Sequence, residues 1–469
     1  MGTGTQNKGD KQPLGIERFF RLGLIIGDDS RELAVKLIHL IRGHGIYKVK
    51  PSKDDKSNNI RFLGAVHDGW KLAQNLIIEK LIHNLREIEA LEKEKIRLHQ
   101  LRLPTEKANT LKTIRKLKLE NLIFRRFVDS IVWGILDNEH STIRRLPIKN
   151  TGDNLSIKNI EDARPTIDEY NECPLTIAIL SDITTFVHHG DIVKRSPSGV
   201  VFIELKSGKK GTSITRTAQI VQNLNCAIAN EILTRNFDNK DKQQLKRTKN
   251  QIERNNNLSS TLRSNLGKDS LTGLNLKIEE TKVTPTFYIS ELMDCRKRLE
   301  ENGNYAITVI DNCLYVGMYK TLEMAYVGFN SWMSMIECKS EIYNLTDSFH
   351  DALSRPLVSL DMPTEFVIEI FKGDVIMVAC LDIEKFLDLS NSIYPSMITL
   401  TTPPRRVNVE NIHIKGKALT MSMGDKFGIG YLGGGLLTRM AYDLQKPSSI
   451  LQMQYAKSNH FYYIPPTTQ

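Results

Sequence analysis

The sequence predicts a multidomain protein that combines α/β and α+β regions. The chain has 469 residues, which is more than one compact domain usually holds. Apolar residues recur at helical spacing through residues 66–100, whereas strand-like stretches begin near residue 174 and again near residue 283. We therefore expect a helical N-terminal region over 1–105, a mixed core over 106–237, a basic polar insert or linker over 238–280, and a β-rich α+β domain over 281–469.

The N-terminal region is expected to contain one long amphipathic helix over residues 66–100. Its apolar positions lie three to five residues apart, at Leu76, Leu81, Leu85, Ile88 and Leu91. Pro104 interrupts this helix, and a second one is expected from about residue 106 to residue 136. The clean heptads of a dimerising coiled coil are absent from the sequence, so the pair is interpreted as a solvated hairpin arm packed on the body.

The remaining elements follow from composition and alternation. Residues 150–172 are polar and turn-rich, residues 174–206 are strand-like, and residues 212–236 read as one helix. The segment 238–270 is rich in Asn, Lys, Gln and Ser, which predicts a flexible or helical insert. In the C-terminal part we expect strands at 287–289, 305–310, 314–318, 366–371 and 375–381.

Charge indicates a polyanionic partner. Lys and Arg number 64 against 54 Asp and Glu, giving a net charge of +10. Residues 90–126 carry eleven Lys or Arg against four Glu, and basic residues also outnumber acidic ones in 238–270. Such runs are usually solvated faces, but here they can also track a nucleic-acid backbone.

Cysteine usage and hydropathy indicate the cellular setting. The six cysteines are scattered without a CxxC pair, which is typical of a reducing cytoplasm and argues against a zinc knuckle. The sequence has no apolar run of 18 residues and no secretory signal pattern at its start. We expect a cytoplasmic protein with no membrane partner, and leave open a homo-oligomer or a protein partner.

The most informative stretch is the predicted β-hairpin of residues 191–206. Residues 191–195 form one strand, 196–199 the turn and 200–206 the other strand. If Arg195 pairs with Val200, Asp191 lies opposite Glu204, and two like charges so placed destabilise a hairpin. A divalent cation between them would resolve the conflict. Lys206 projects from the same face as Glu204, which completes an arrangement suited to phosphodiester hydrolysis.

These residues resemble the PD-(D/E)xK nuclease superfamily. The match consists of Asp191 and then Glu204-Leu205-Lys206, thirteen residues later, at the end of an apolar strand. The resemblance covers roughly residues 120–235 and implies a restriction-endonuclease-like mixed sheet flanked by helices. It also implies that Asp191 and Glu204 bind Mg²⁺, for which Mn²⁺ can substitute, and that Lys206 assists catalysis.

The family pattern has three further positions to place. An acidic residue on a helix before the sheet is expected at Asp129, with Asp137 and Glu139 as alternatives on the same helix. Some branches also carry a glutamine on the helix after the lysine strand. Gln219 and Gln222 lie there, and Gln222 is assigned to the catalytic set. The residue before Asp191 departs from the pattern, because it is Gly190 and not proline.

The hairpin and the resemblance therefore predict a magnesium-dependent nuclease that hydrolyses phosphodiester bonds, with DNA favoured over RNA as the substrate. Whether it is an endonuclease or an exonuclease is left open. Large flanking regions around such a core suggest defence against foreign DNA. The alternative is a catalytically inactive nucleic-acid-binding or scaffold protein that retains the nuclease fold. A complete metal site, including the carboxylate of the upstream helix, would distinguish the two.

Overall fold

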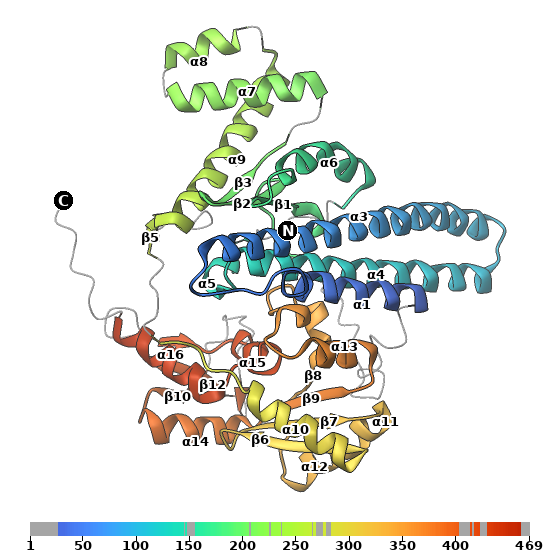
Figure 1. The fold of residues 1–469 in the computed structure, drawn as a ribbon, viewed down its shortest axis with the longest axis vertical. Coiled ribbons are helices and arrows are strands. Elements are labelled where there is room, and N and C mark those ends of the chain that lie inside the picture. Colours follow the sequence, from blue (N-terminus) through green and yellow to red (C-terminus); the bar gives the residue numbers. More distant parts are fainter. Residues whose placement is uncertain are drawn as a thin grey trace. The chain divides into compact units, whose positions relative to one another are not determined.

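The chain forms two compact units, which are described separately here (Figure 1). One unit is Glu32–Glu279, and the other is Glu280–Gln469 together with Met1–Arg31. The computed structural model describes residues 27–144, 146–147, 155–205, 208–224, 227–235, 237–264, 266–268, 275–277, 283–402, 413–414, 417–422 and 429–460. Both units combine helices with small sheets, so the chain is a mixed α and β protein, as the sequence predicts.

Long helices dominate residues 28–143, nearly all of which belong to the Glu32–Glu279 unit. They are α1 (Asp28–Arg42), α2 (His44–Lys48), α3 (Lys56–Gln100) and α4 (Pro104–Ile135), followed by the short α5 (His140–Ile143). Helix α3 begins ten residues before the predicted start, because Asp55 caps it by accepting a hydrogen bond from the Asn58 N–H at 3.0 Å. Pro104 occupies the first turn of α4, where its missing N–H costs nothing.

Helices α3 and α4 pack against each other along their length, as the predicted hairpin requires (Figure 1). Toward the loop that joins them, Ile88, Ile114 and Leu117 form an apolar cluster. Between the helices the buried Asn84 amide donates hydrogen bonds to Glu120 at 2.9 Å and to Asn121 at 2.8 Å. The helices are therefore held by apolar burial and by a buried polar network.

A helix, three strands and a helix follow in order: α6 (Ile157–Asn171), β1 (Ile177–Leu180), β2 (Ile192–Ser196), β3 (Gly199–Ile203) and α7 (Gly208–Leu224). The short 3-10 turn η2 (Ser181–Ile183) follows β1. Each strand pairs antiparallel with the next, in the order β1-β2-β3. Arg195 pairs with Val200 and Ile192 with Ile203, so the predicted hairpin register is confirmed.

The outer edge of β1 is bonded to side chains of two helices. Gln74 of α3 donates to the Ala178 carbonyl and accepts from the Leu180 N–H, both at 3.0 Å. Asn171, the last residue of α6, accepts from the Ala178 N–H at 2.8 Å. These amide groups satisfy the backbone where a further strand would otherwise pair, and they fix α6 beside the sheet.

Helices α8 (Ala227–Thr234) and α9 (Asn239–Ser264) come after α7. The described part of residues 212–236 thus belongs to two helices, where one was predicted, and most of the predicted basic insert is helix α9. Leu245 of α9 packs on Ile214 and Ala218 of α7. The strands β4 (Leu266–Lys268) and β5 (Asn275–Lys277) pair only with each other among the described residues. The described part of the core sheet is antiparallel, so the expected mixed sheet is not seen there.

The Glu280–Gln469 unit contains a four-stranded antiparallel sheet in the order β6-β7-β9-β8. Its strands are β6 (Tyr305–Ile310), β7 (Leu314–Tyr319), β8 (Ile342–Asn344) and β9 (Ile376–Leu381). Around it lie α10 (Ile289–Asn302), α11 (Leu322–Met324), the π-helical turn η3 (Ala325–Phe329), α12 (Asn330–Met335), the 3-10 turns η4 (Leu345–His350) and η5 (Leu357–Ser359), and α13 (Thr364–Lys372). The strands predicted at 305–310, 314–318 and 375–381 are confirmed.

The rest of this unit contains a second, smaller sheet and three helices. They are α14 (Ile383–Ile393), β10 (Ile398–Thr401), β11 (His413–Ile414), β12 (Lys417–Ser422), β13 (Ile429–Tyr431), α15 (Gly435–Ala441) and α16 (Pro447–His460). In this sheet β12 pairs with β10, β11 and β13, always antiparallel. None of the described helices combines the length and the apolar character needed to cross a membrane.

Two predicted strands in this unit are wrong. Residues 366–371 lie in helix α13, where Phe366, Val367, Ile370 and Phe371 are buried at helical spacing. The helix ends at Gly373, whose left-handed backbone (φ +82°) is typical of a helix C-terminus. At 287–289 only Phe287 makes an isolated bridge, with Gln445, and Ile289 already begins α10.

Candidate functional site

Asp191 and Glu204 lie at the same end of the β2–β3 hairpin. Immediately beyond the last ladder pair, Ile192 with Ile203, the Asp191 N–H donates to the Ile203 carbonyl at 2.7 Å. On the other side, the Asp191 carbonyl accepts from the Ser181 N–H at 2.8 Å. The Asp191 carboxylate also accepts from the Leu205 N–H. Asp191 is thus fixed between the end of β1 and the end of β3, opposite Glu204.

Gly190, immediately before Asp191, has a backbone conformation that proline would not adopt. Its φ is +64°, a left-handed backbone that proline, with its φ fixed near −65°, does not adopt. A Cβ atom at this position would lie 2.8 Å from the Ile203 carbonyl oxygen. Glycine is therefore required for the chain to turn into β2 this close to β3.

Helix α6 supplies an acidic residue that is not among the predicted site residues. Residues 150–172 are predicted to be turn-rich, but Ser156 caps a helix there by accepting from the Asn159 N–H at 3.2 Å. Pro165 inside the helix weakened the helical pattern. The buried positions Ile160, Ala163 and Ile167 still recur at spacings of three and four, which is the signal that could have found it. One turn of this helix carries Asp162.

Asp162, Asp191 and Glu204 line one pocket of about 660 Å³ in the Glu32–Glu279 unit. They come from α6, from the residue before β2 and from the residue after β3. Asp182 and Asn159 also line it, and the Asn159 amide donates to the Asp182 carboxylate at 3.1 Å. The wall formed by α7 contributes Thr215, Arg216 and Gln219. Among the described residues of the lining, four carboxylates therefore face one guanidinium.

The donor set fits a hard divalent cation. Carboxylate oxygens from three separate elements, with no sulfur or imidazole among the described lining residues, are the ligands that Mg²⁺ and Mn²⁺ prefer. In the part of the chain that the structure describes, no three acidic, histidine or cysteine side chains are already gathered closely enough to hold a metal ion. A cation would therefore have to draw these carboxylates together.

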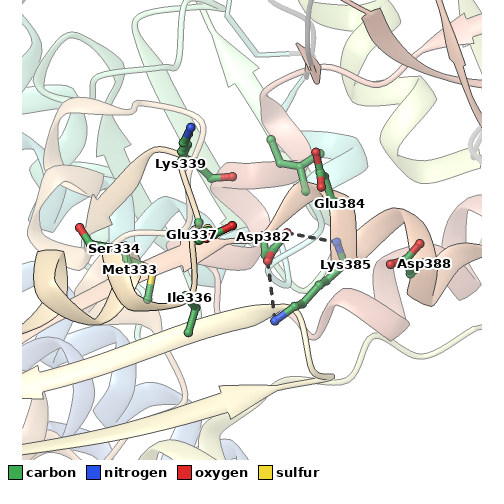
Figure 2. A pocket seen from close by; sticks show the side chains of 12 residues that line it. Met333, Ser334, Ile336, Glu337, Lys339, Asp382, Glu384, Lys385 and Asp388 are labelled. Atoms are coloured by element: carbon green, nitrogen blue, oxygen red, sulfur yellow. Dashed lines mark hydrogen bonds and ion pairs between the residues drawn. The ribbon is translucent and has the colours of Figure 1, made fainter.

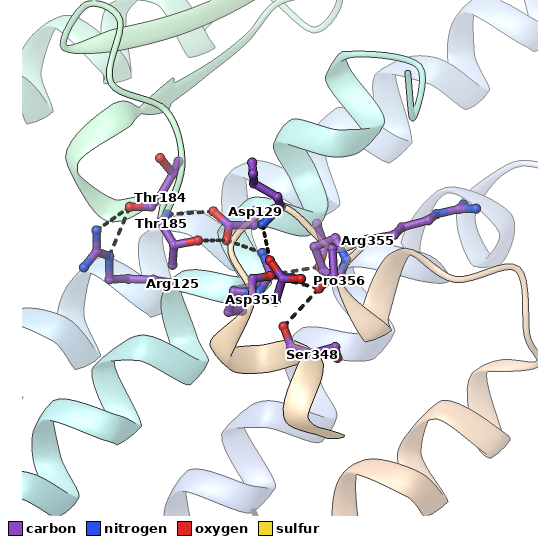
Figure 3. A network of polar contacts seen from close by, with 12 residues as sticks. Arg125, Asp129, Thr184, Thr185, Ser348, Asp351, Arg355 and Pro356 are labelled. Atoms are coloured by element: carbon purple, nitrogen blue, oxygen red, sulfur yellow. Dashed lines mark hydrogen bonds and ion pairs between the residues drawn. The ribbon is translucent and has the colours of Figure 1, made fainter. Parts of the chain in front are cut away.

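Asp129, the expected upstream acid, has a different place. It is fully buried in α4, and its carboxylate pairs with the equally buried Arg126 at 2.8 Å. It also accepts from the Thr185 N–H at 2.8 Å and from the Thr185 hydroxyl, while the neighbouring Arg125 donates to the Thr184 carbonyl (Figure 3). Asp129 thus anchors the β1–β2 connection to α4 and is not among the lining residues of the pocket.

The two alternatives on the same segment are also placed elsewhere. Asp137 forms an ion pair with Arg195 of β2, with 2.9 Å between Nη1 and each carboxylate oxygen. Glu139 precedes α5 at its N-terminus. His189, two residues before Asp191, is buried, and its ring meets that of Phe202 edge-on with 6.2 Å between centroids. Neither Asp137, Glu139 nor His189 is a described lining residue of the pocket.

Two of the predicted catalytic residues are not described in full. Lys206 lies outside the described residues, so its position next to Glu204 stays a prediction. Gln222 belongs to α7, but its side chain is not described. The glutamine found in the lining of the pocket is Gln219, one turn earlier on the same helix.

Comparisons with protein-family models, with curated proteins and with solved structures find no match for this chain. The residues of the pocket are therefore the basis on which a function can be inferred.

Proposed function

We propose that the chain is a metal-dependent nuclease whose site is the pocket lined by Asp162, Asp191 and Glu204. One observation carries the proposal: three carboxylates from different elements line a single pocket, together with a guanidinium. Their separation in the sequence means that the fold itself brings them to one place. Such clusters are most often found at functional sites, because a fold gains nothing from them alone.

The charge of the pocket supports a cation. A phosphodiester is an anion, and four carboxylates against one arginine would repel it from the described lining. A divalent cation reverses the local charge and makes the same pocket attractive to phosphate. When bound, Mg²⁺ would polarise the phosphate and lower the pKa of a water molecule.

Each residue of the pocket then has a proposed role in binding the cation or the phosphate. Asp162, Asp191 and Glu204 would hold the cation, with Asp191 pre-positioned by the Leu205 N–H. Arg216 of α7 is exposed on the pocket wall and would contact a non-bridging phosphate oxygen. Lys206 is proposed to steady the attacking hydroxide or the negative charge that develops on the phosphate. Asp162 is thus the proposed cation ligand on a helix before the sheet, the role that the sequence predicts for Asp129.

The order of elements also supports the resemblance to PD-(D/E)xK nucleases. A helix with an acidic residue, three antiparallel strands and a second helix follow one another from Ile157 to Leu224. The hairpin carries its acids at one end, in the predicted register. The finer assignment, a restriction-endonuclease-like core, belongs to this proposal.

Nucleic acid is the proposed substrate, with DNA favoured over RNA. The net charge of +10 and the basic helices agree with a polyanion. Along α4, Lys112, Arg115 and Lys116 are exposed, and so are Lys242 and Lys246 along α9. Cleavage and binding should therefore weaken steeply with salt. A cytoplasmic role in defence against foreign DNA is proposed by analogy with other nucleases that have large flanking regions.

The experiment is to measure divalent-dependent cleavage of plasmid DNA by the wild type and by Glu204→Gln and Lys206→Ala. Each substitution should lower the rate roughly 100-fold or more, because Glu204→Gln removes a ligand of the cation and Lys206→Ala removes the positive charge beside the reacting phosphate. Glu169→Gln changes an exposed carboxylate on α6 that is not a described lining residue, and is the matched control. Wild-type cleavage by both site variants would contradict the proposal.

The alternative, an inactive nucleic-acid-binding or scaffold protein, is tested by calorimetry with Mn²⁺. The nuclease should bind Mn²⁺ and lose that binding in Asp191→Asn. A chain that binds DNA but releases no heat with Mn²⁺, in either form, would support the scaffold.

A further inference from the structure

Two cysteine sulfurs approach each other in the Glu280–Gln469 unit. Cys380 lies on β9, opposite Ile342 of β8, and is fully buried. Cys338 lies in the segment between α12 and β8 and is half-buried. Their Sγ atoms are 3.6 Å apart, although 42 residues separate them in the chain. Both are free thiols in this structure.

The end of α12 positions Cys338. Glu337 adopts a left-handed backbone with φ +57°, a conformation that glycine or asparagine usually supplies at this place. The turn allows the Cys338 N–H to donate to the Met333 carbonyl at 2.9 Å. The helix therefore ends in a tight cap, and the next side chain turns back toward β9. A strained residue held immediately before Cys338 is consistent with a specific role for that position.

Cys338 lines a pocket of about 1090 Å³, whereas Cys380 does not. Figure 2 shows the residues of the segment before β8 on one side of this pocket and the start of α14 on the other. Its charged lining residues are Glu337, Lys339, Asp382, Glu384, Lys385 and Asp388. A solute in the pocket can thus reach one sulfur of the pair, while the other stays within the apolar cluster that contains Tyr315, Phe329 and Val378.

The contact between the two sulfurs also shifts the pKa values of the two thiols in opposite directions. The contact with the Cys380 sulfur lowers the pKa of Cys338 to about 6, and the Cys380 thiol also donates to the Ser340 carbonyl at 3.6 Å. The same contact, together with burial, raises the pKa of Cys380. The lowered pKa favours the thiolate form of Cys338, which is the form that attacks an electrophile, and the raised pKa keeps the proton on Cys380. This is the division between an attacking and a resolving thiol.

We propose that Cys338 and Cys380 are a peroxide-reactive thiol pair that closes to a disulfide in a site separate from the nuclease pocket. The Cys338 sulfur attacks one oxygen of hydrogen peroxide, so that an S–O bond forms, the O–O bond breaks and hydroxide leaves as water. The Cys380 sulfur then attacks the Cys338 sulfur, which forms the S–S bond and breaks the S–O bond. The second hydroxide takes the Cys380 proton and leaves as water. The two thiols lose two electrons together, and the peroxide is reduced to two waters.

The pocket favours a small neutral oxidant over a larger anionic one. Four carboxylates line it against two lysines, which repels glutathione disulfide and similar anions but not hydrogen peroxide. The sulfurs need to approach from 3.6 Å to about 2.05 Å, the length of a disulfide bond. Cys338 lies outside regular secondary structure, so this segment can supply the movement while β9 stays in place.

The experiment treats the folded full-length chain with hydrogen peroxide, blocks remaining thiols and maps peptides by mass spectrometry. The wild type should yield a cross-linked peptide pair of Cys338 and Cys380, about 2 Da lighter than the two thiols, which dithiothreitol reverses. Cys380→Ala should instead leave a sulfenic acid on Cys338 that dimedone traps. Cys338→Ser should slow the loss of the Cys380 thiol roughly tenfold or more.

Two controls test whether the cross-link is specific to Cys338 and Cys380 and whether each variant is folded. Cys173→Ser removes an exposed thiol of the other unit and should leave the cross-link unchanged. Circular dichroism verifies that each variant is folded. The proposal is overturned if peroxide oxidises Cys338 beyond sulfenic acid in the wild type while the Cys380 thiol stays available to alkylation. It is equally overturned if Cys380 reacts at the wild-type rate in Cys338→Ser.

Discussion

The carboxylate of Asp191 accepts a hydrogen bond from the backbone N–H of Leu205, the residue that follows Glu204. One strand end therefore positions both carboxylates of the proposed metal site. Because the donor is a backbone group, it is present with any residue other than proline at position 205. The orientation of Asp191 depends on the hairpin register, and the register depends on the turn at Ser196–Gly199.

Asp162 and Asp129 are predicted to respond differently to the same chemical change. Asp162→Asn should abolish Mn²⁺ binding in calorimetry and lower cleavage roughly 100-fold, with little change in stability, because the side chain is exposed on α6. Asp129→Asn should cost about 1–3 kcal/mol of unfolding free energy, since it removes a charged group that lies 2.8 Å from the buried Arg126 guanidinium. Urea unfolding measures the second effect.

The two variants also serve as controls for each other. Per folded molecule, Asp129→Asn should keep its affinity for Mn²⁺. A loss of metal binding in Asp129→Asn at temperatures where it is folded, with normal binding in Asp162→Asn, would restore the assignment made from the sequence.

Gly190 is predicted to tolerate no side chain. Gly190→Ala places a Cβ atom 2.8 Å from the Ile203 carbonyl oxygen at a left-handed φ, which should cost about 1–3 kcal/mol and displace Asp191. The control is Gly199→Ala at the other end of the hairpin, where φ is +112° and the nearest atoms are 3.7 Å away on the Arg263 side chain. Both variants should melt earlier, but only Gly190→Ala should lose Mn²⁺ affinity. If Gly190→Ala and Gly199→Ala bind Mn²⁺ with equal affinity, Gly190 does not position Asp191 for the cation.

The hairpin could be predicted from the sequence because its determinants are local. A turn over 196–199 between two apolar strands sets the register, and the register alone places Asp191 opposite Glu204. The third acid could not be chosen in the same way. Asp129 and Asp162 both lie on helices before the sheet, and tertiary contacts decide which one faces the pocket. Arg126 and Thr185, the partners that hold Asp129 elsewhere, have no signature in the local sequence.

The wrong strand at 366–371 has a related cause. Phe366, Val367, Ile370 and Phe371 form a short apolar run, which periodicity cannot assign to helix or strand by itself. Helix α13 fits because residues 366, 367, 370 and 371 fall on one buried face. Pro363 before it and Gly373 after it were the boundary signals that favoured a helix. For residues 366–371, the boundary residues Pro363 and Gly373 predict the secondary structure better than the β-branched and aromatic composition of the segment does.

Arg216 is predicted to contribute a phosphate contact. Arg216→Ala should weaken DNA binding roughly tenfold at moderate salt and lower the magnitude of the slope of log K against log salt by about 1. Arg61→Ala, an exposed arginine of α3 that is not a described lining residue of the pocket, should change neither quantity by a comparable amount. Fluorescence anisotropy with a labelled duplex measures both. An unchanged salt slope in Arg216→Ala would remove this residue from the site.

Asp443 makes the Glu280–Gln469 unit sensitive to pH. It is buried, and burial raises its pKa from 3.8 to about 7, although it accepts a hydrogen bond from the Arg355 N–H at 2.6 Å and Arg439 is nearby. An unfolded chain releases this proton near pH 3.8, whereas the folded chain holds it until about pH 7. The folded state binds more protons between these values. The stability that this proton supplies is therefore complete below about pH 4 and is lost as the pH rises through about 7.

Asp443→Asn should remove this dependence. Asparagine can still accept the Arg355 N–H but never ionises, so the variant should become more stable than the wild type at neutral and higher pH. The difference in unfolding free energy between variant and wild type should grow by on the order of 1–3 kcal/mol from about pH 5 to about pH 8. Urea unfolding of both proteins across this range, followed by fluorescence, measures it. A difference that stays constant with pH would show that Asp443 has an ordinary pKa in the folded chain.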